Sequence, residues 1–227
     1  MSAATPASAS ASMPASVSTA TTTAAPGAAV DAAERLRIAV ITSSVREGRF
    51  CPTVAAWTAE RAAERGDLEV DLVDLAEHPL PLSMPGPGGA LLPDPAWAHA
   101  ALGERLAAAD GFVVVTPEYN HSFPAGLKNA IDWYRTEWQA KPVAFVSYGG
   151  LAGGLRAVEQ LRVVFAELHA TTIRETVSFH NVWEQFDAAG RLASPEAATA
   201  AATTLLDRLA WWSRALRQAR ATTPYGS

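Results

Sequence analysis

The sequence is poor in cysteine and has no excess of positive charge. Its 227 residues include one cysteine, Cys51, which excludes an intrachain disulfide and a metal site built from several thiolates. Lys and Arg number 18 against 23 Asp and Glu, for a formal net charge of −5. Nucleic-acid backbones are bound by clustered cations, so this balance argues against a nucleic-acid partner. A lone thiol fits a reducing compartment, and we expect a cytoplasmic protein.

The N-terminal segment lacks the side chains that build a core. Residues 1–33 consist largely of Ala, Ser, Thr, Pro and Gly, with no charge before Asp31. Such a segment cannot offset the entropy lost on ordering, so we predict a disordered tail. It has neither the basic start nor the apolar stretch of a secretory signal, and no apolar run approaches the roughly 20 residues that span a bilayer. We expect no membrane partner, one domain over 34–220, and a flexible end over 221–227.

Strand and helix patterns alternate between these ends. Apolar or alternating runs predict strands over 36–42, 68–75, 111–116, 142–148 and 170–179. Helical patterns cover 52–66, 96–110, 124–138, 153–169 and 194–219, with Ser194 as the expected N-cap of the last. Six prolines make 79–95 a long irregular loop. The alternation indicates an α/β fold with a parallel sheet covered by helices on both faces.

Three loops after the predicted strands carry unusual residues, at the edge where such sheets bind ligands. The first, "TSSVREGRF", places hydroxyls and arginines at a helix start and suits a phosphate group. It is neither a Walker A loop nor a G-x-G-x-x-G fingerprint, which argues against nucleotide hydrolysis and a standard NAD domain. The loop "SYGGLAGG" lets backbone approach a flat ligand. Ordinary solvated turns are the alternative for both loops.

The third loop belongs to a longer recognisable segment. "TPEYNHSFPAGLKNAIDW", residues 116–133, resembles the signature of the NADPH-dependent FMN reductase family. "ITSSVREGRF" and "SYGGLAGGLRAVEQLR" are similar to the family's phosphate loop and third flavin loop, so the resemblance covers roughly 36–180. It implies a flavodoxin-like three-layer sandwich with a five-stranded parallel sheet of order 2-1-3-4-5. It also implies a homodimer or homotetramer with non-covalent FMN, which passes hydride from NADPH or NADH to a small acceptor such as free flavin or a quinone.

The resemblance also implies the residues that hold the cofactor. The expected phosphate-binding residues are Ser44 and Arg46, with Arg49 and the amides around Phe50 and Cys51 closing the cup. The expected border of the isoalloxazine and ribityl chain, mainly through backbone, is Pro117, Glu118, Tyr119 and Asn120. The other edge would be covered by Ser147, Tyr148, Gly149 and Gly150.

Two positions depart from the family pattern. Ser43 replaces the usual glycine before the phosphate serine, a mild change if its φ is negative. Cys51 stands where many relatives have Asn or Ser, and because a thiol is a weak hydrogen-bond donor, we expect weaker phosphate binding.

No side chain is expected to act as acid, base or nucleophile, because the cofactor carries the chemistry. His121 lies in the flavin loop and could protonate an acceptor, although a solvated loop histidine is the simpler interpretation. The five histidines lack metal-ligand spacing, and no metal site is expected. Trp133, Tyr134 and Trp138 are predicted on one helix, which in the resembling family borders a subunit interface. Ordinary core is the alternative, and we expect an interface with only Trp133 in the core.

Two other functions remain open. One is an FMN-binding electron carrier or regulatory module that does not turn over NAD(P)H. A dedicated carrier usually has a strongly acidic docking face, and a charge of −5 spread along the chain argues mildly against it. The other is a flavoprotein dedicated to one biosynthetic pathway, whose specificity would lie in the proline-rich segment 79–95.

Overall fold

The computed structural model of the protein describes residues 34–86, 89 and 93–226. The predicted disordered tail, residues 1–33, lies outside the described residues. The chain forms a five-stranded parallel sheet of order β2-β1-β3-β4-β5, which confirms the predicted topology. The strands are β1 Leu36–Thr42, β2 Leu68–Asp74, β3 Gly111–Pro117, β4 Pro142–Tyr148 and β5 Thr171–Phe179. Because β1 pairs with both β2 and β3, the strand order switches beside β1, where ligands bind in such sheets.

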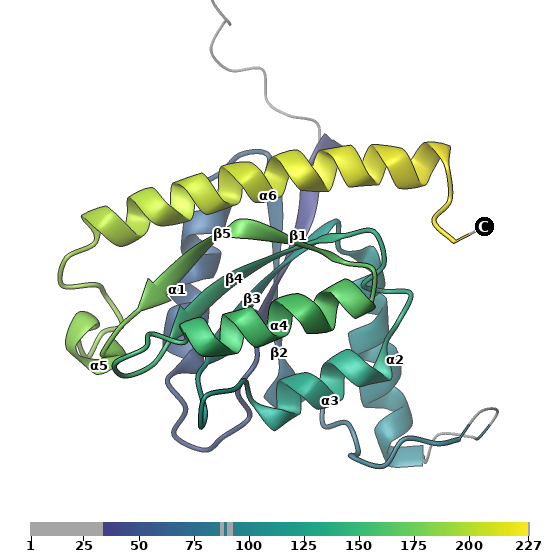
Figure 1. The fold of residues 1–227 in the computed structure, drawn as a ribbon, viewed down its shortest axis with the longest axis horizontal. Helices are drawn as coiled ribbons and strands as arrows, with labels where there is room; N and C mark the ends of the chain where they lie inside the picture. Colours follow the sequence, from purple (N-terminus) through teal and green to yellow (C-terminus); the bar gives the residue numbers. More distant parts are fainter. Residues whose placement is uncertain (1–33, 87–88, 90–92, 227) are drawn as a thin grey trace, which may run out of the picture.

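Helices cover both faces of the sheet. One face carries α1 (Cys51–Ala63) and α6 (Glu196–Thr222). The other carries α2 (Pro93–Ala108), α3 (Ala125–Trp133) and α4 (Leu155–Glu167). Figure 1 shows α6 on one side of the sheet and α3 and α4 on the other. Two short helices complete the chain, η2 (Leu75–Glu77) and α5 (Val182–Gln185), and the arrangement is the predicted three-layer sandwich.

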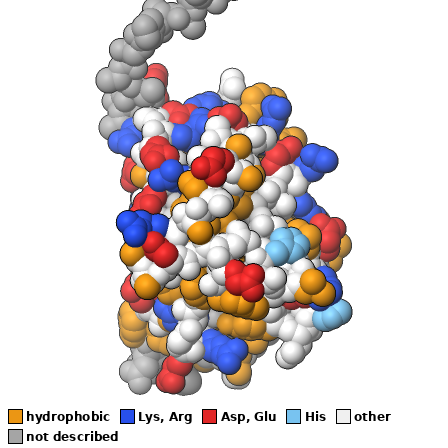
Figure 2. Space-filling model, turned by 90° about the vertical axis from the view of Figure 1, so that its left-hand side faces the viewer, with side chains coloured by type: hydrophobic (Ala, Val, Ile, Leu, Met, Phe, Trp, Pro, Cys, Tyr) orange, Lys and Arg blue, Asp and Glu red, His pale blue; other side chains and the backbone are white. Residues whose placement is uncertain are grey.

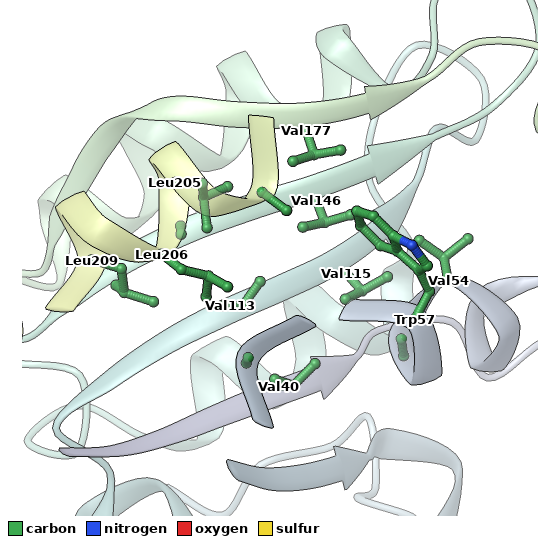
Figure 3. Packing of buried hydrophobic residues seen from close by; sticks show 14 of the residues in the cluster. Val40, Val54, Trp57, Val113, Val115, Val146, Val177, Leu205, Leu206 and Leu209 are labelled. Atoms are coloured by element: carbon green, nitrogen blue, oxygen red, sulfur yellow. The ribbon is translucent and has the colours of Figure 1, made fainter. Parts of the chain in front are cut away.

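The core follows from the apolar runs of the central strands. Every residue of β3 and β4 is buried, as continuous Val and Phe runs predict for strands covered on both faces. Figure 3 shows valines of the sheet packed beneath Leu205, Leu206 and Leu209 of α6 and beside Trp57 of α1. Burial of each such side chain contributes roughly 1.5–3 kcal/mol. This core fixes the strand ends, and therefore the loops that leave them.

The segment after α3 differs from the prediction. The helix expected over 124–138 ends at Trp133, because Tyr134 is extended, with φ −127° and ψ 146°. Tyr134 and Trp138 are therefore off the helix and only 3% and 1% exposed, inside the monomer's core, whereas Trp133 is only partly buried. The prediction that Tyr134 and Trp138 continue the helix and face a partner subunit is wrong, since it assumed helical spacing throughout. Trp133 packs against the core, where it was expected.

The last helix also departs from its expected bounds. It begins at Glu196, with Pro195 at the N-cap and no side-chain cap, so the predicted capping role of Ser194 is wrong. The Pro195 carbonyl accepts the first helical bond, from the amide of Thr199, at 2.8 Å. The helix continues to Thr222, into the segment expected to be flexible, and the hydroxyl of Tyr225 lies 2.7 Å from Nδ1 of His169.

Lys141 is buried at the amino-terminal end of the sheet, directly before β4. Its Nζ donates to the carbonyls of Leu106 and Ala107 at 2.8 Å, and the residue is 6% exposed. The pKa of Lys141 is lowered to about 8, mainly by burial and secondly by the nearby positive charge of Arg220.

This pKa predicts that the protein becomes more stable as pH rises from about 8 to 10.5. The unfolded chain holds the Lys141 proton up to its ordinary pKa of 10.5, whereas the folded chain loses it near 8, so deprotonation favours folding between these values. We expect the free energy of unfolding, measured with urea across this range, to rise by about 1–3 kcal/mol relative to Lys141→Met. Parallel pH profiles of the two proteins would contradict the assignment.

Within the part of the chain that the structure covers, none of the helices combines the length and apolar character needed to cross a membrane.

Candidate functional site

The loops after β1, β3 and β4 meet at the carboxyl-terminal edge of the sheet. Figure 2 views the molecule from this side, where hydrophobic side chains lie among charged ones. The loops border a cavity of about 440 Å³. A larger hollow of about 790 Å³ lies along the β5 edge and is lined mainly by charged and threonine side chains. We take the smaller cavity as the site because strand-end loops converge on it.

Nine of the 13 predicted cofactor residues line this cavity. They are Arg46, Arg49, Phe50, Pro117, Glu118, Tyr119, Tyr148, Gly149 and Gly150. The other four do not line it and are Ser44, Cys51, Asn120 and Ser147. The structure thus brings together most of the residues that the sequence assigned to one ligand.

The loop after β1 offers an anion site at the start of α1. Phe50 is the N-cap and makes no side-chain cap bond. Pro52 has no amide hydrogen and the Thr53 amide donates to the Phe50 carbonyl at 3.1 Å, so the amides of Phe50 and Cys51 are the ones left for a ligand. Arg46 is exposed, with its guanidinium 6.0 Å from the centre of the Tyr119 ring. Arg49 differs, because its Nη2 is paired with Asp74 at 2.5 Å. Arg46 is therefore the arginine with its charge available to a ligand.

The segment after β3 is a tight hairpin that presents Tyr119 to this loop. Tyr119 and Ser122 exchange both backbone hydrogen bonds, at 2.8 and 3.0 Å, around Asn120 and His121. Both turn residues have positive φ, 51° and 68°, as a two-residue hairpin turn requires. The Tyr119 hydroxyl then lies 2.8 Å from the Ser44 hydroxyl, which joins the first and third strand loops.

Glu118 has a side-chain role that the sequence did not reveal. Its carboxylate accepts from the Arg156 guanidinium at 2.7 Å and from the Arg156 amide at 3.2 Å. The N-cap of α4, Gly154, has no side chain to perform this function. Glu118, which is distant in sequence, thus caps α4. It ties the β3 loop to the helix that follows the glycine-rich loop, residues 149–154.

A hydrogen bond from Ser147 holds the glycine-rich loop. The buried Ser147 hydroxyl donates to the Gly153 carbonyl at 2.8 Å, and so does Ser178. Gly153 and Gly154 have φ of 58° and 85°, in the left-handed region that other residues rarely adopt. Ser147 therefore shapes the wall of the cavity rather than facing into it.

Cys51 points away from the cavity. Its thiol donates to the Val115 carbonyl at 3.3 Å in the core, and burial raises the pKa of Cys51, so the thiol stays protonated. The thiol packs in the core and is not available as a nucleophile. Only the backbone amide of Cys51 could donate to a ligand. The other departure, Ser43, does not adopt a positive φ, which meets the condition set by the sequence.

Three buried polar atoms on this side of the molecule lack a partner. Within the described residues, the hydroxyls of Ser43 and Tyr148 and the Nε of Arg49 have no hydrogen-bond partner of ordinary geometry. Tyr148 lies close to the Cys51 thiol, and burial raises the pKa of Tyr148. Buried donors without partners are costly unless a ligand or water binds them. Arg49 and Tyr148 line the cavity, whereas Ser43 does not. A cavity with these two donors, the amides of Phe50 and Cys51, and Arg46 fits the phosphate and ribityl end of FMN.

The sequence missed one wall of the cavity. Val182 and Trp183 line it from α5, a four-residue helix after β5. Its weak sequence signal is the Asn-Val-Trp run that follows the last strand, where Asn181 adopts a left-handed φ of 46°. For metals, no group of three His, Cys, Asp or Glu side chains suitable for an ion occurs among the residues described.

Comparisons with known proteins agree with this geometry. Residues 36–184 match the family model described as NADPH-dependent FMN reductase. An NAD(P)H-dependent FMN reductase of Schizosaccharomyces pombe is 43% identical over 121 residues, which are 52% of this chain and 60% of that protein. A 2-hydroxy-1,4-benzoquinone reductase of a Burkholderia species is 32% identical over 186 residues, 79% of this chain and 97% of that protein.

A solved structure supports the fold. It is a flavoenzyme NAD(P)H:(acceptor) oxidoreductase from Paracoccus denitrificans, matched with a TM-score of 0.59 and 22% identity over 79% of this chain and 97% of that one. The matched region of the Schizosaccharomyces relative is less than two thirds of its length. The family model spans more than half of the chain, including the three loops that border the cavity. The chain belongs to the NADPH-dependent FMN reductase family.

Proposed function

We propose that this protein is an NAD(P)H-dependent oxidoreductase that holds FMN without a covalent bond and passes electrons to a small acceptor such as free flavin or a quinone. One observation carries the proposal: a single cavity joins Phe50 and Arg46 at the start of α1 to the β3 hairpin and the glycine-rich loop. Family membership and the relatives' names support the same activity.

The residues divide by the part of FMN that they would bind. Arg46 and the amides at the start of α1 would hold the phosphate. Pro117 to Tyr119 would border the ring system on one side, and Gly149 and Gly150 on the other. A Cβ built on Gly149 would lie 3.8 Å from the Glu118 side chain, so the two loops touch there and form one continuous wall of the cavity.

The chain's own groups bind and orient rather than react. Bound FMN supplies hydride transfer from the nicotinamide. Cys51 is protonated and buried, and Glu118 is engaged by Arg156, so neither is free to act as nucleophile or base. The amides of Glu118, Tyr119 and Gly149 are already engaged in backbone hydrogen bonds. The Gly150 amide is the one at the border of the ring that is left to stabilise charge developing on it.

A steady-state assay tests the proposal. Purified protein saturated with FMN should oxidise NADPH or NADH only slowly in the absence of oxygen, and rapidly when 2-methyl-1,4-naphthoquinone is added. Protein that binds FMN but gives no acceleration with either nucleotide would instead be a carrier or regulatory module.

Gln160 is expected to support FMN binding from outside the cavity. Its Nε2 donates to the His121 carbonyl at 2.6 Å, and its Oε1 accepts from Ser122 at 2.5 Å, which fastens the hairpin tip to α4. We predict that Gln160→Ala raises the FMN dissociation constant about threefold to tenfold, since two hydrogen bonds that hold the hairpin are lost. The neighbouring exposed Glu159, paired with Arg162, gives the matched control Glu159→Ala. Equal affinities in the two variants, measured by flavin fluorescence, would contradict this role.

We also propose a cytoplasmic location and a homodimer or homotetramer. The lone cysteine supports the first. An apolar hollow of about 390 Å³ between the segment 75–82 and α3, with Leu82 83% exposed beside it, supports the second. Light scattering of the purified protein would give the mass, and a mass near 23.9 kDa would exclude the oligomer.

A further inference from the structure

Trp183 is a large aromatic side chain held in the open beside the cavity. It is 62% exposed, whereas the other aromatic residues of the lining, Phe50, Tyr119 and Tyr148, are partly or fully buried. Exposure alone is ordinary, since Trp97 and Trp211 are 57% and 60% exposed, but Trp183 also lines the cavity. Exposed aromatic surface at the rim of a cavity makes Trp183 a candidate binding residue.

The backbone next to Trp183 is anchored to the glycine-rich loop. The amide of Asn181 donates to the Gly150 carbonyl at 3.0 Å, and the amide of Val182 donates to the Gly149 carbonyl at 3.1 Å. Val182 is 3% exposed and packs in the core. Because Val182 faces inward, the next residue on this short helix is turned toward another face. The backbone that carries the indole is thus tied to the same loop that borders the cavity.

The surface beside Trp183 combines glycine backbone with an exposed apolar side chain, and the exposed Glu184 follows on the helix. A Cβ built on Gly150 would lie 3.4 Å from Cη2 of the indole, so the ring stands against backbone with no side chain between them. Leu151, 86% exposed, follows in the chain. The nearby carboxylate of Glu118 is neutralised by Arg156. The exposed face of the indole and this backbone offer contact area to a planar aromatic or quinonoid ring.

We propose that Trp183 is a specificity residue on which a planar, uncharged electron acceptor of the quinone class stacks. The inference rests on the proposed function, in which bound FMN must leave one ring face open to a second substrate. The reaction balances as NAD(P)H plus one solvent proton plus quinone giving NAD(P)⁺ plus hydroquinone, so the quinone gains two electrons and two protons. Trp183 contributes contact area and takes no part in proton or electron transfer.

Acceptor kinetics at saturating FMN test the role. Trp183→Ala should raise the KM for 2-methyl-1,4-naphthoquinone about fivefold to tenfold, the loss expected for one stacking contact, and change kcat less than twofold. The KM for ferricyanide, an anion that cannot stack, should stay unchanged. Trp183→Phe should remain within about threefold of the natural protein. Trp211, 60% exposed on α6 and absent from the cavity lining, gives the matched control Trp211→Ala.

A binding measurement makes the result independent of turnover. The dissociation constant of the naphthoquinone for oxidised, FMN-saturated protein, from flavin or tryptophan fluorescence, should rise by the same factor in Trp183→Ala. Unchanged quinone affinity, an equal effect on both acceptors, or a loss of FMN affinity alone would overturn the proposal. Failure of the proposed function looks different: neither NADPH nor NADH would reduce the natural protein, while the binding measurement would still decide the role of Trp183.

Discussion

Replacement of Gly154 by alanine is expected to destabilise the protein by about 3 kcal/mol or more and to abolish FMN binding. Gly154 has φ of 85°, and an added Cβ would lie 2.6 Å from Cβ of Ser147 and 2.8 Å from the Tyr148 nitrogen. These neighbours belong to β4, which is buried throughout and cannot retreat. The glycine-rich loop would have to move, and the wall at Gly149 and Gly150 would move with it.

Gly48 provides the control for this substitution. Its φ of 64° is also left-handed, but an added Cβ meets nothing within 4 Å. Gly48→Ala should therefore cost only about 1 kcal/mol, from the backbone conformation. The free energy of unfolding in urea, measured for both variants without cofactor, separates the cost of the backbone conformation from the cost of the close contact. Equal losses would show that the close contact at Gly154 is relieved by a small shift, and would remove the basis for the expected loss of FMN.

Arg46→Ala is expected to weaken FMN binding roughly 10- to 100-fold, the range for one lost hydrogen bond to a charged group. Arg46 is exposed at the start of the phosphate loop and has no ion-pair partner within the part of the chain described, so its charge is free for a ligand. Arg49 is committed to Asp74, and Arg49→Ala should reduce stability as well as affinity.

Riboflavin, which lacks the phosphate, serves as the matched ligand. Arg46→Ala should leave its dissociation constant nearly unchanged, so the preference for FMN over riboflavin should fall by the same factor as FMN affinity. Isothermal titration with both ligands measures this ratio. A parallel loss for riboflavin would show that Arg46 supports the shape of the site and does not bind the phosphate.

The sheet could be predicted because its signals are local. Continuous Val and Phe runs mark β3 and β4, the alternating run at 68–74 marks the half-exposed edge strand β2, and helices separate them. The predictions failed at the ends of two helices, α3 and α6. Helix periodicity alone does not show that Tyr134 turns extended, and a serine before a proline resembles an N-cap even where the helix starts later.

The site was predictable where one stretch of chain supplies both the residue and its neighbours. The loops after β1, β3 and β4 carry their own hydroxyls, arginines and glycines. Partners distant in sequence were not predictable: Arg49 with Asp74, Glu118 with Arg156, and Ser44 with Tyr119 meet only in the folded chain. Trp183 was missed because α5 has only four residues, too few to show any periodicity.

The proposed reductase activity depends on a bound flavin that NAD(P)H can reduce. The direct measurement is the absorbance spectrum of the FMN-saturated protein, freed of unbound flavin and kept without oxygen, before and after addition of NADPH and then NADH. We predict flavin bands near 370 and 450 nm that bleach with at least one nucleotide. Bands that persist with both would leave a flavin carrier, and protein that retains no flavin after saturation would contradict the assignment of the cavity itself.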